Sequence, residues 1–187
     1  MMLIISYLLC DRKITEKINQ DMYRYLKWSN PEGMSNLKKF IACKKKKDFL
    51  PVYKFRLLST NRVARFIGKL GLLFAGCPNT VDIAGTIEGG LFVSHAFSVI
   101  VPKTAGKNLR VGPGVVIGRV GQYFPVIGDN VYIAANSTVI GNVHIGNNCI
   151  IGAGTVVTKD IPDNSVVVGN PMRIIRSINE SDYNEIM

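Results

Sequence analysis

The chain has 187 residues, of which 47% are hydrophobic, and a formal net charge of +10 at pH 7. This length and apolar content allow one sizeable core with a small appendage, and they exclude a disordered or collagen-like chain. The charge lies in the first part of the chain: residues 1–70 hold 16 Lys and Arg against 5 Asp and Glu, whereas residues 71–187 hold 7 against 8. No base-reading module accompanies the basic segment, so we expect no nucleic-acid binding.

The four cysteines form neither a CxxC pair nor a pattern with metal-ligand spacing, so no metal site is expected. The opening residues, MMLIISYLLC, are apolar but lack a preceding positive charge and a cleavage site. They are also too short to cross a bilayer, which takes about 20 residues. These features predict a reduced, cytoplasmic protein, with peripheral contact to an inner membrane as one option.

Residues 1–28 are predicted to be helical, because apolar residues recur there at a four-residue step. They are Ile14, Ile18, Met22 and Leu26. Residues 31–33 break this pattern, and a lysine-rich stretch at 38–47 precedes a second helix expected over 53–74. The lysines suit either a solvated face or attraction to a polyanionic acceptor or an anionic lipid surface. Residues 1–79 therefore predict an α-helical N-terminal segment with weak membrane-surface contact as one candidate role.

From residue 81 to residue 157 a small aliphatic residue or Ala returns at every sixth position, with one interruption. A period of six is typical of neither a helix nor an ordinary strand. It indicates a parallel β-helix in which each flat coil takes three hexads and the periodic residues stack inside. Gly and Asn between them suit corners with unusual backbone angles. The periodic positions are Val81, Ile87, Val93, Val99, Ala105, Val111, Ile117, Ile127, Ile133, Val139, Ile145, Ile151 and Val157.

The interruption lies between Ile117 and Ile127, where the step is ten residues instead of six. Four extra residues therefore form a loop within 119–125, and loops that leave a regular solenoid commonly carry function. After Val157 the next position of the series is Asp163, so the repeat is expected to stop there. Cys149 falls on an interior position and predicts a core-packing role.

The chain has two histidines. His144 directly precedes the periodic Ile145, so its side chain is expected to face solvent. His95 has apolar or small neighbours, and its spacing alone leaves two roles open. It is either a structural histidine with satisfied hydrogen bonds or a general base held near neutrality.

Several segments together resemble the hexapeptide-repeat O-acetyltransferases. The resemblance rests on the hexads, on Ser-His-Ala at 94–96, on the run IGAGTVVTKDIP at 151–162 and on VGNPMRIIR at 168–176. The most similar branch holds the serine acetyltransferases and the related sugar and capsule O-acetyltransferases. The resemblance implies a mainly β fold with a left-handed parallel β-helix over 80–176, after the helical segment 1–79 and before a tail at 177–187. It also implies a homotrimer with acetyl-CoA in the groove between neighbouring subunits.

The resemblance assigns two catalytic residues. His95 matches the base that takes a proton from the acceptor hydroxyl, and Asp82 matches the carboxylate that orients this histidine. The Asp82 to His95 spacing is two residues shorter than in serine-type members, so a polar corner residue remains the alternative role for Asp82. Small residues would let the pantetheine arm approach the coil backbone, and basic residues suit its phosphates. The matching cofactor positions are Ala134, Gly152, Ala153, Thr158, Lys159, Arg173 and Arg176.

Two departures from serine-type members bear on the acceptor. Those members carry an acidic residue before the histidine and an Asp-Arg-His-Pro run in the loop, where this chain has Ser94 and Gln-Tyr-Phe-Pro at 122–125. An aromatic pair beside a hydroxyl and an amide suits a sugar ring better than a zwitterion. The expected acceptor contacts are Ser94, Gln122, Tyr123 and Phe124.

The sequence thus predicts an acetyl-CoA-dependent O-acetyltransferase that needs no metal and acts on a sugar of a surface polysaccharide or its precursor. One alternative is a serine O-acetyltransferase of cysteine biosynthesis, which fits the overall resemblance and Asp82. An alternative of another class is a non-catalytic trimeric scaffold that displays the basic helices.

Overall fold

The structure is a computed structural model that describes residues 1–78, 80–95, 97–179 and 181–182, apart from the side chain of Trp28. It divides into two compact units. The helical unit comprises Met1–Asn79 and Gly89–Phe92, and the coil unit comprises Thr80–Glu88 and Val93–Met187. Residues 79 and 96 lie outside this description, as do residues 180 and 183–187 of the tail expected at 177–187.

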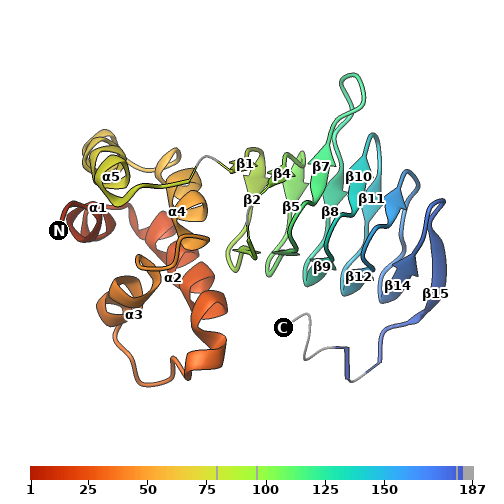
Figure 1. Cartoon of the computed structure of the whole chain (residues 1–187), viewed down its shortest axis with the longest axis horizontal. Helices are drawn as coiled ribbons and strands as arrows, with labels where there is room; N and C mark the ends of the chain where they lie inside the picture. Colours follow the sequence, from red (N-terminus) through yellow and green to blue (C-terminus); the bar gives the residue numbers. More distant parts are fainter. Residues whose placement is uncertain (79, 96, 180, 183–187) are drawn as a thin grey trace. The chain divides into compact units, whose positions relative to one another are not determined.

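The helical unit contains α1 (Met2–Leu8), α2 (Arg12–Leu26), the short 3-10 helix η1 (Lys27–Ser29), α3 (Asn36–Cys43), α4 (Phe49–Leu57) and α5 (Arg62–Ala75) (Figure 1). The single helix expected over 53–74 is wrong, since the chain breaks between α4 and α5. Asn61 explains the break: its side chain accepts a hydrogen bond from the backbone N–H of Ala64 (2.9 Å) and caps α5. Likewise, the helix expected over 1–28 is divided at residues 9–11.

A buried ion pair joins the helices to one loop of the unit. The Asp21 side chain is 0% exposed and that of Arg56 is 3% exposed, and the two meet through Nε–Oδ2 (2.8 Å) and Nη2–Oδ1 (3.0 Å) contacts. Oδ1 also accepts hydrogen bonds from the backbone N–H groups of Gly90 (2.9 Å) and Leu91 (2.8 Å). Burial raises the pKa of the Asp21 carboxyl, and the Arg56 guanidinium opposes this rise. Asp21 thus fixes the 89–92 loop, which leads directly into β3.

The coil unit is a parallel β-solenoid with three sheets, which the chain visits in turn (Figure 1). Sheet A contains β1 (Val81–Ile83), β4 (Ser98–Ile100), β7 (Val116–Gly118), β10 (Thr138–Ile140) and β13 (Val156–Val157). Sheet B contains β2 (Thr86–Ile87), β5 (Thr104–Ala105), β8 (Val126–Ile127) and β11 (His144–Ile145). Sheet C contains β3 (Phe92–Val93), β6 (Arg110–Val111), β9 (Val131–Ile133), β12 (Cys149–Ile151), β14 (Ser165–Val168) and the antiparallel β15 (Arg173–Ser177). The predicted coil architecture of hexapeptide repeats is confirmed.

The interior of the coils contains eleven of the thirteen periodic side chains as buried residues. Val81 is half-buried, and Val99 is wrongly expected inside, since it is 39% exposed while Ser98 and Ile100 are buried. The step from Val93 to the next large interior side chain, Ile100, is seven residues, and the following step to Ala105 is five. The corner after β3 is thus one residue longer than the others, and the next corner is one residue shorter.

Asparagines at the corners between sheets B and C form a ladder that supports successive coils. Each has a left-handed backbone with φ between 53° and 60°, which Asn tolerates better than most residues. The side-chain amides of the first three donate to the Asn side chain of the next coil, with a distance of 2.9 Å at each of the three steps. The ladder consists of Asn108, Asn130, Asn148 and Asn164. The expected use of Asn at corners is confirmed.

The coils continue beyond Val157, where the sequence period ends. Ile161, and not Asp163, is the next buried side chain, and it pairs in parallel with Ile145 of β11. The corner between Val157 and Ile161 is therefore two residues tighter than a regular hexad, and β14 then pairs with β12. Cys149 is fully buried and His144 is exposed, as predicted.

Candidate functional site

His95 occupies the longer corner, between β3 and β4, and its side chain is exposed. This corner belongs to the C–A edge, where the chain passes from sheet C to sheet A. The described residues of this edge are 94, 95, 97, 112–115, 134–137 and 152–155. His95 has a φ of 65° and Phe97 a φ of 68°. A left-handed non-glycine residue costs roughly 1–2 kcal/mol, and such residues cluster at functional sites. Gly114, Asn136 and Gly154 have the same left-handed backbone in the other corners of this edge, so the outlier particular to this corner is the backbone of His95.

Asp82 lies on β1, in the sheet that follows the C–A edge. Its side chain is exposed, and the residue pairs with Val99 of β4. The backbone N–H of Phe97 donates to the Thr80 carbonyl (2.7 Å), which ties the His95 corner to the start of this strand. Among residues 80–95 and 97–179 no hydrogen bond joins Asp82 to His95. The orienting role of Asp82 stays a prediction.

Small residues line the C–A edge on the later coils. Ala134 follows β9 and Gly152 follows β12 one coil on, and the backbone N–H of Ala134 donates to the Ile151 carbonyl (2.8 Å). A Cβ on Gly152 would lie 2.7 Å from the Val168 side chain, so a larger residue would disturb the coil. Ala153 is exposed beside it. The lack of a side chain at Gly152 thus makes room for Val168, whereas the small exposed side chain of Ala153 leaves the outer surface of the edge open to an extended amide chain.

Ser94 lies on the same edge, immediately before His95. Its hydroxyl donates to the Val111 carbonyl of the next coil (3.3 Å), and its backbone N–H donates to the same oxygen (2.9 Å). Ser94 is half-buried. In this geometry the hydroxyl supports the corner that carries His95, besides any contact with an acceptor.

The two arginines expected near the cofactor differ in their surroundings. Arg173 pairs with Val168 at the start of β15, which brings it close to the C–A edge, and it is exposed. Arg176 instead forms a bidentate ion pair with Asp182, through Nη1–Oδ2 and Nη2–Oδ1 (2.8 Å). The Arg176 guanidinium lowers the pKa of Asp182 to about 2. The Arg176 charge is thus already paired within the chain, which weakens its expected contact with a phosphate.

The remaining predicted residues lie on a second edge, the A–B edge, where the chain passes from sheet A to sheet B. Thr158 and Lys159 are exposed there, after β13. The protruding loop, residues 119–125, leaves the same edge between β7 and β8, as the ten-residue step predicts (Figure 1).

The tip of the protruding loop is a two-residue hairpin turn. Val120 and Tyr123 exchange backbone hydrogen bonds of 3.0 and 3.1 Å around Gly121, whose φ is 59°. A positive φ at the first central position is the feature of a type II′ turn, which favours Gly there. Gln122 is exposed, Tyr123 is 54% exposed and Phe124 is half-buried. The turn therefore presents Gln122 and Tyr123 to solvent.

The predicted site residues thus form two groups on either side of sheet A. The group on the C–A edge contains Ser94, His95, Ala134, Gly152 and Ala153, with Arg173 close by. The group on the A–B edge contains Gln122, Tyr123, Phe124, Thr158 and Lys159. Arg176 belongs to neither group, and Asp82 lies on sheet A itself, between the two edges.

Two further exposed residues border these groups and were missed from the sequence. Phe97 is 79% exposed, two residues after His95. The six-residue period predicted Val99 as interior and so concealed the longer corner. Arg119 is exposed at the base of the protruding loop. The sequence signal that could have identified Arg119 as a site residue is its position at the break in the six-residue period. Among the described residues no group of three His, Cys, Asp or Glu side chains could hold a metal ion.

Comparisons with known proteins give a family model and several relatives. Residues 124–159 match the family model described as bacterial transferase hexapeptide (six repeats). The serine acetyltransferase of Bacillus pumilus (strain SAFR-032) is 36% identical over 119 residues, which are 60% of this chain and 54% of that protein. Serine acetyltransferase 2 of Arabidopsis thaliana is 36% identical over 110 residues, 54% of this chain and 34% of that protein. The chain thus spans about half or less of the length of these relatives.

Solved structures show the same similarity. Serine acetyltransferase from Neisseria gonorrhoeae has a TM-score of 0.64 and 28% identity, over 94% of this chain and 70% of that chain. The same enzyme in complex with serine has a TM-score of 0.61 and 29% identity, over 87% of this chain and 69% of that chain. A serine acetyltransferase in complex with CoA, at 22% identity and a TM-score of 0.63 over 91% and 73%, shows the fold alone. Residues 124–159 therefore carry the bacterial transferase hexapeptide repeat, and the chain shares its fold with serine acetyltransferases.

Proposed function

We propose that this chain is an acetyl-CoA-dependent O-acetyltransferase whose acceptor is L-serine. The support for serine is that the relatives named above are serine acetyltransferases and that one similar solved structure holds serine. The sugar of a surface polysaccharide, which the loop residues suggested, has no support in these comparisons.

The observation that carries the proposal is the corner at His95. An exposed histidine with a left-handed backbone lies at one end of the edge that bears Ala134, Gly152 and Ala153. A general base must be reachable by the proton it takes, and an exposed imidazole meets that condition. The small residues below it allow the thioester-bearing arm of acetyl-CoA to lie along the coil backbone. The base and the acyl donor would then share one edge.

The chemistry follows from these positions. His95 takes the proton of the acceptor hydroxyl as that oxygen forms a bond to the thioester carbonyl carbon. The carbon–sulfur bond then breaks, and the imidazolium of His95 returns its proton to the leaving CoA sulfur. The products are an acetyl ester and free CoA, and His95 regains its neutral form. A positioned base of this kind contributes about 10²–10⁴-fold to the rate.

Two exposed charges near the edges of sheet A suit the two ends of serine. Arg119, at the base of the loop, presents a guanidinium that can bind a carboxylate with two hydrogen bonds. Asp82, on β1, presents a carboxylate that can pair with an ammonium group. These residues supply charges at positions other than those of the serine-type motif, which this chain lacks in the loop and before His95.

A sugar acceptor is the second candidate, and one observation favours it. The tip of the loop exposes the Tyr123 ring and the Gln122 amide, neither of which carries a charge. Such a pair can stack on a sugar ring and bond its hydroxyls. With serine as the acceptor, Arg119 should bind the carboxylate of the substrate. With a neutral sugar there is no carboxylate, so Arg119 should have no such role.

The two edges would meet if neighbouring copies of the chain packed side by side. The outward face of sheet A exposes Val99 (39%) and Val116 (37%), which are neighbours in the sheet register. Adjacent exposed valines suit an interface between subunits. We therefore extend the proposal to a homotrimer in which His95 of one copy faces the protruding loop of another copy. Acetyl-CoA would then contact Lys159 across the groove.

Release of the CoA thiol, measured with L-serine or with neutral sugars as acceptor, tests this proposal. With serine we expect turnover, and the Arg119→Gln variant should raise KM at least about tenfold, because a charged hydrogen bond to the carboxylate is lost. Lys107→Gln, an exposed charge change on another edge, should leave KM unchanged. Turnover with a sugar but not with serine would contradict the serine assignment. The absence of turnover with either acceptor, together with intact trimers, would contradict the proposal and favour a non-catalytic trimeric scaffold.

A further inference from the structure

Helix α5 has an unusual distribution of side chains, because small residues are buried and large apolar residues are exposed. Its buried side consists mainly of small residues, Ala64, Gly68 and Gly71, together with Leu72. A Cβ on Gly68 would lie 2.5 Å from Leu57, and one on Gly71 would lie 2.9 Å from Leu3. The neighbouring helices therefore approach α5 closely, which only small residues allow.

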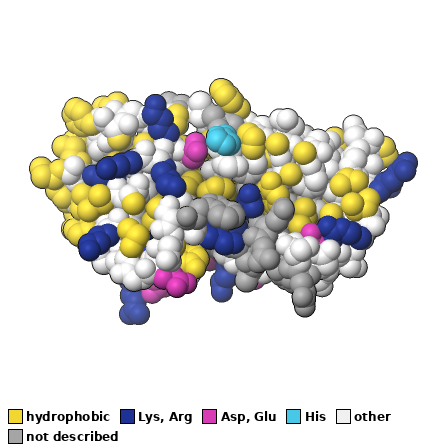
Figure 2. All heavy atoms as spheres, turned by 60° about the horizontal axis from the view of Figure 1, so that its bottom comes forward, with side chains coloured by type: hydrophobic (Ala, Val, Ile, Leu, Met, Phe, Trp, Pro, Cys, Tyr) yellow, Lys and Arg dark blue, Asp and Glu magenta, His cyan; other side chains and the backbone are white. Residues whose placement is uncertain are grey.

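The opposite side of α5 carries large apolar side chains in solvent. Four apolar residues of α5 follow the spacing i, i+3, i+10 and i+11, which places them on one helical face, and all four are highly exposed. They are Val63 (60%), Phe66 (71%), Leu73 (76%) and Phe74 (76%). Helix α1, which packs against α5, adds Ile5 (39%) and Leu8 (63%). Figure 2 shows apolar side chains gathered at the left end of the view, where Figure 1 places α1 and α5. A surface of this kind marks an interaction site.

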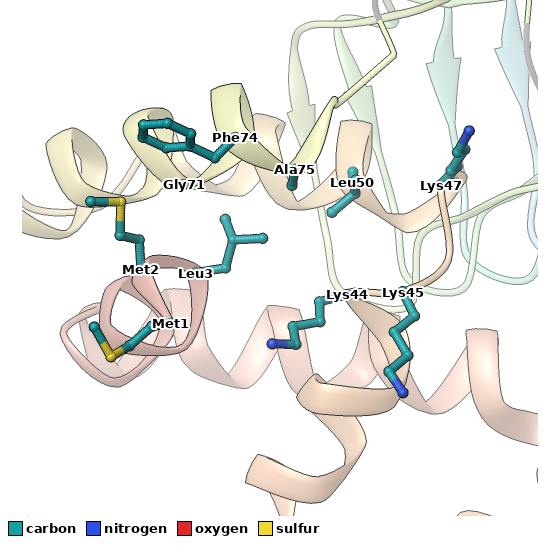
Figure 3. A pocket seen from close by; sticks show the side chains of 10 residues that line it. All are labelled: Met1, Met2, Leu3, Lys44, Lys45, Lys47, Leu50, Gly71, Phe74 and Ala75. Carbon is teal, nitrogen blue, oxygen red and sulfur yellow. The ribbon is translucent and has the colours of Figure 1, made fainter.

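A cavity of about 700 Å³ opens between the start of α1, the end of α5 and the segment that follows α3. Figure 3 shows Phe74 and Met2 on one side of this cavity and the side chains of Lys44 and Lys45 on the other. Lys47 also lines it. Lys46 does not, since its ammonium donates to the Tyr25 carbonyl (2.8 Å). The apolar face thus borders three lysines.

We infer that α1, α5 and Lys44, Lys45 and Lys47 form a docking surface for an anionic lipid bilayer. The lysines suit the acidic headgroups, and the apolar side chains suit the boundary between headgroups and acyl chains. None of the described helices is long and apolar enough to span a bilayer, so the unit would lie on the surface.

The charges argue against a second copy of the chain as the occupant. A twofold interface through this face would use the same patch on both subunits, and this patch, made of apolar side chains and lysines, offers no carboxylate to Lys44, Lys45 and Lys47. A soluble polyanion would match the lysines but would leave the Phe66 and Phe74 rings in water. An anionic lipid surface satisfies both parts of the patch.

Flotation of the full-length protein with vesicles tests the inference. We expect binding to vesicles of phosphatidylcholine and phosphatidylglycerol (3:1) and little binding to phosphatidylcholine alone. The triple variant Lys44→Gln, Lys45→Gln, Lys47→Gln should lower partitioning on the order of 100-fold, because each lysine at an anionic surface contributes about fivefold. The double variant Phe66→Ser, Phe74→Ser should lower it by at least about tenfold, through loss of apolar contact.

A charge-matched control is Lys13→Gln, Lys103→Gln, Lys107→Gln, which removes three exposed lysines elsewhere and should bind as the wild type does. Circular dichroism and thermal melts of all variants check that each is folded. Equal loss of binding in the control and in the Lys44, Lys45 and Lys47 variant would overturn the inference, as would failure of the wild type to bind anionic vesicles. A lower molar mass of the Phe66→Ser, Phe74→Ser variant in light scattering without lipid would assign the face to self-association instead.

Discussion

Replacement of Asp21 by Asn tests whether the buried ion pair holds the helical unit together. The carboxylate accepts two hydrogen bonds from Arg56 and two from the backbone N–H groups of the 89–92 loop. An amide has one oxygen to accept these bonds, and its NH₂ group would face donors. Breaking one partner of a buried pair leaves the other charge uncompensated, which costs about 3–5 kcal/mol. We therefore expect Asp21→Asn to lower the free energy of unfolding by that amount.

Urea denaturation followed by circular dichroism measures this loss, and two variants serve as controls. Glu16→Gln breaks the Arg12–Glu16 pair, whose side chains are 94% and 59% exposed, and should cost at most about 0.5 kcal/mol. Asp21→Leu combined with Arg56→Met removes both charges and so avoids the uncompensated arginine, but it leaves the backbone N–H groups of Gly90 and Leu91 without an acceptor and should recover only part of the stability lost in Asp21→Asn. A loss below about 1 kcal/mol for Asp21→Asn would refute the reasoning.

Three further predictions concern other parts of the chain. Cys43 and Cys149 are fully buried, whereas Cys10 and Cys77 are half-buried, and burial raises the pKa of the Cys43 thiol to about 12, so at most two of the four thiols, Cys10 and Cys77, should react with a thiol reagent in the native protein. Asn130→Ala removes two ladder bonds at a residue with φ of 57° and should lower the unfolding free energy by about 1–3 kcal/mol, measured by urea denaturation. Val116→Glu places a charge on the outward face of sheet A and should convert the proposed trimers to monomers in light scattering, while circular dichroism shows that the coil fold is retained.

The regular part of the fold could be predicted because its signal is local. Each hexad places one small apolar residue inside, so position in the sequence fixes position in the coil, and the ten-residue step located the protruding loop. The longer corner at His95 could not be seen in this way. The step of seven residues to Ile100 and the step of five to Ala105 sum to two ordinary hexads, so the period continues unbroken and Val99 was assigned to the wrong face.

The parts that could not be predicted depend on contacts between distant residues. Asp21 lies about 70 positions before the 89–92 loop that it holds, and no spacing in the sequence links the two. The pairing of Arg176 with Asp182 likewise depends on how the chain turns after β15. Which site residues share an edge became visible only when the corners were assigned to sheets. That assignment separated His95 from the loop residues.

The most direct test of the central claim is the His95→Asn variant, assayed for turnover and for acetyl-CoA binding. Asn tolerates the left-handed backbone of this corner, and the side chain is exposed, so the coil should remain intact. If His95 is the general base, turnover should fall by about 10²–10⁴-fold, whereas the Kd for acetyl-CoA and the Tm should stay unchanged. Turnover within about tenfold of the wild type would contradict the assignment of His95 as the base.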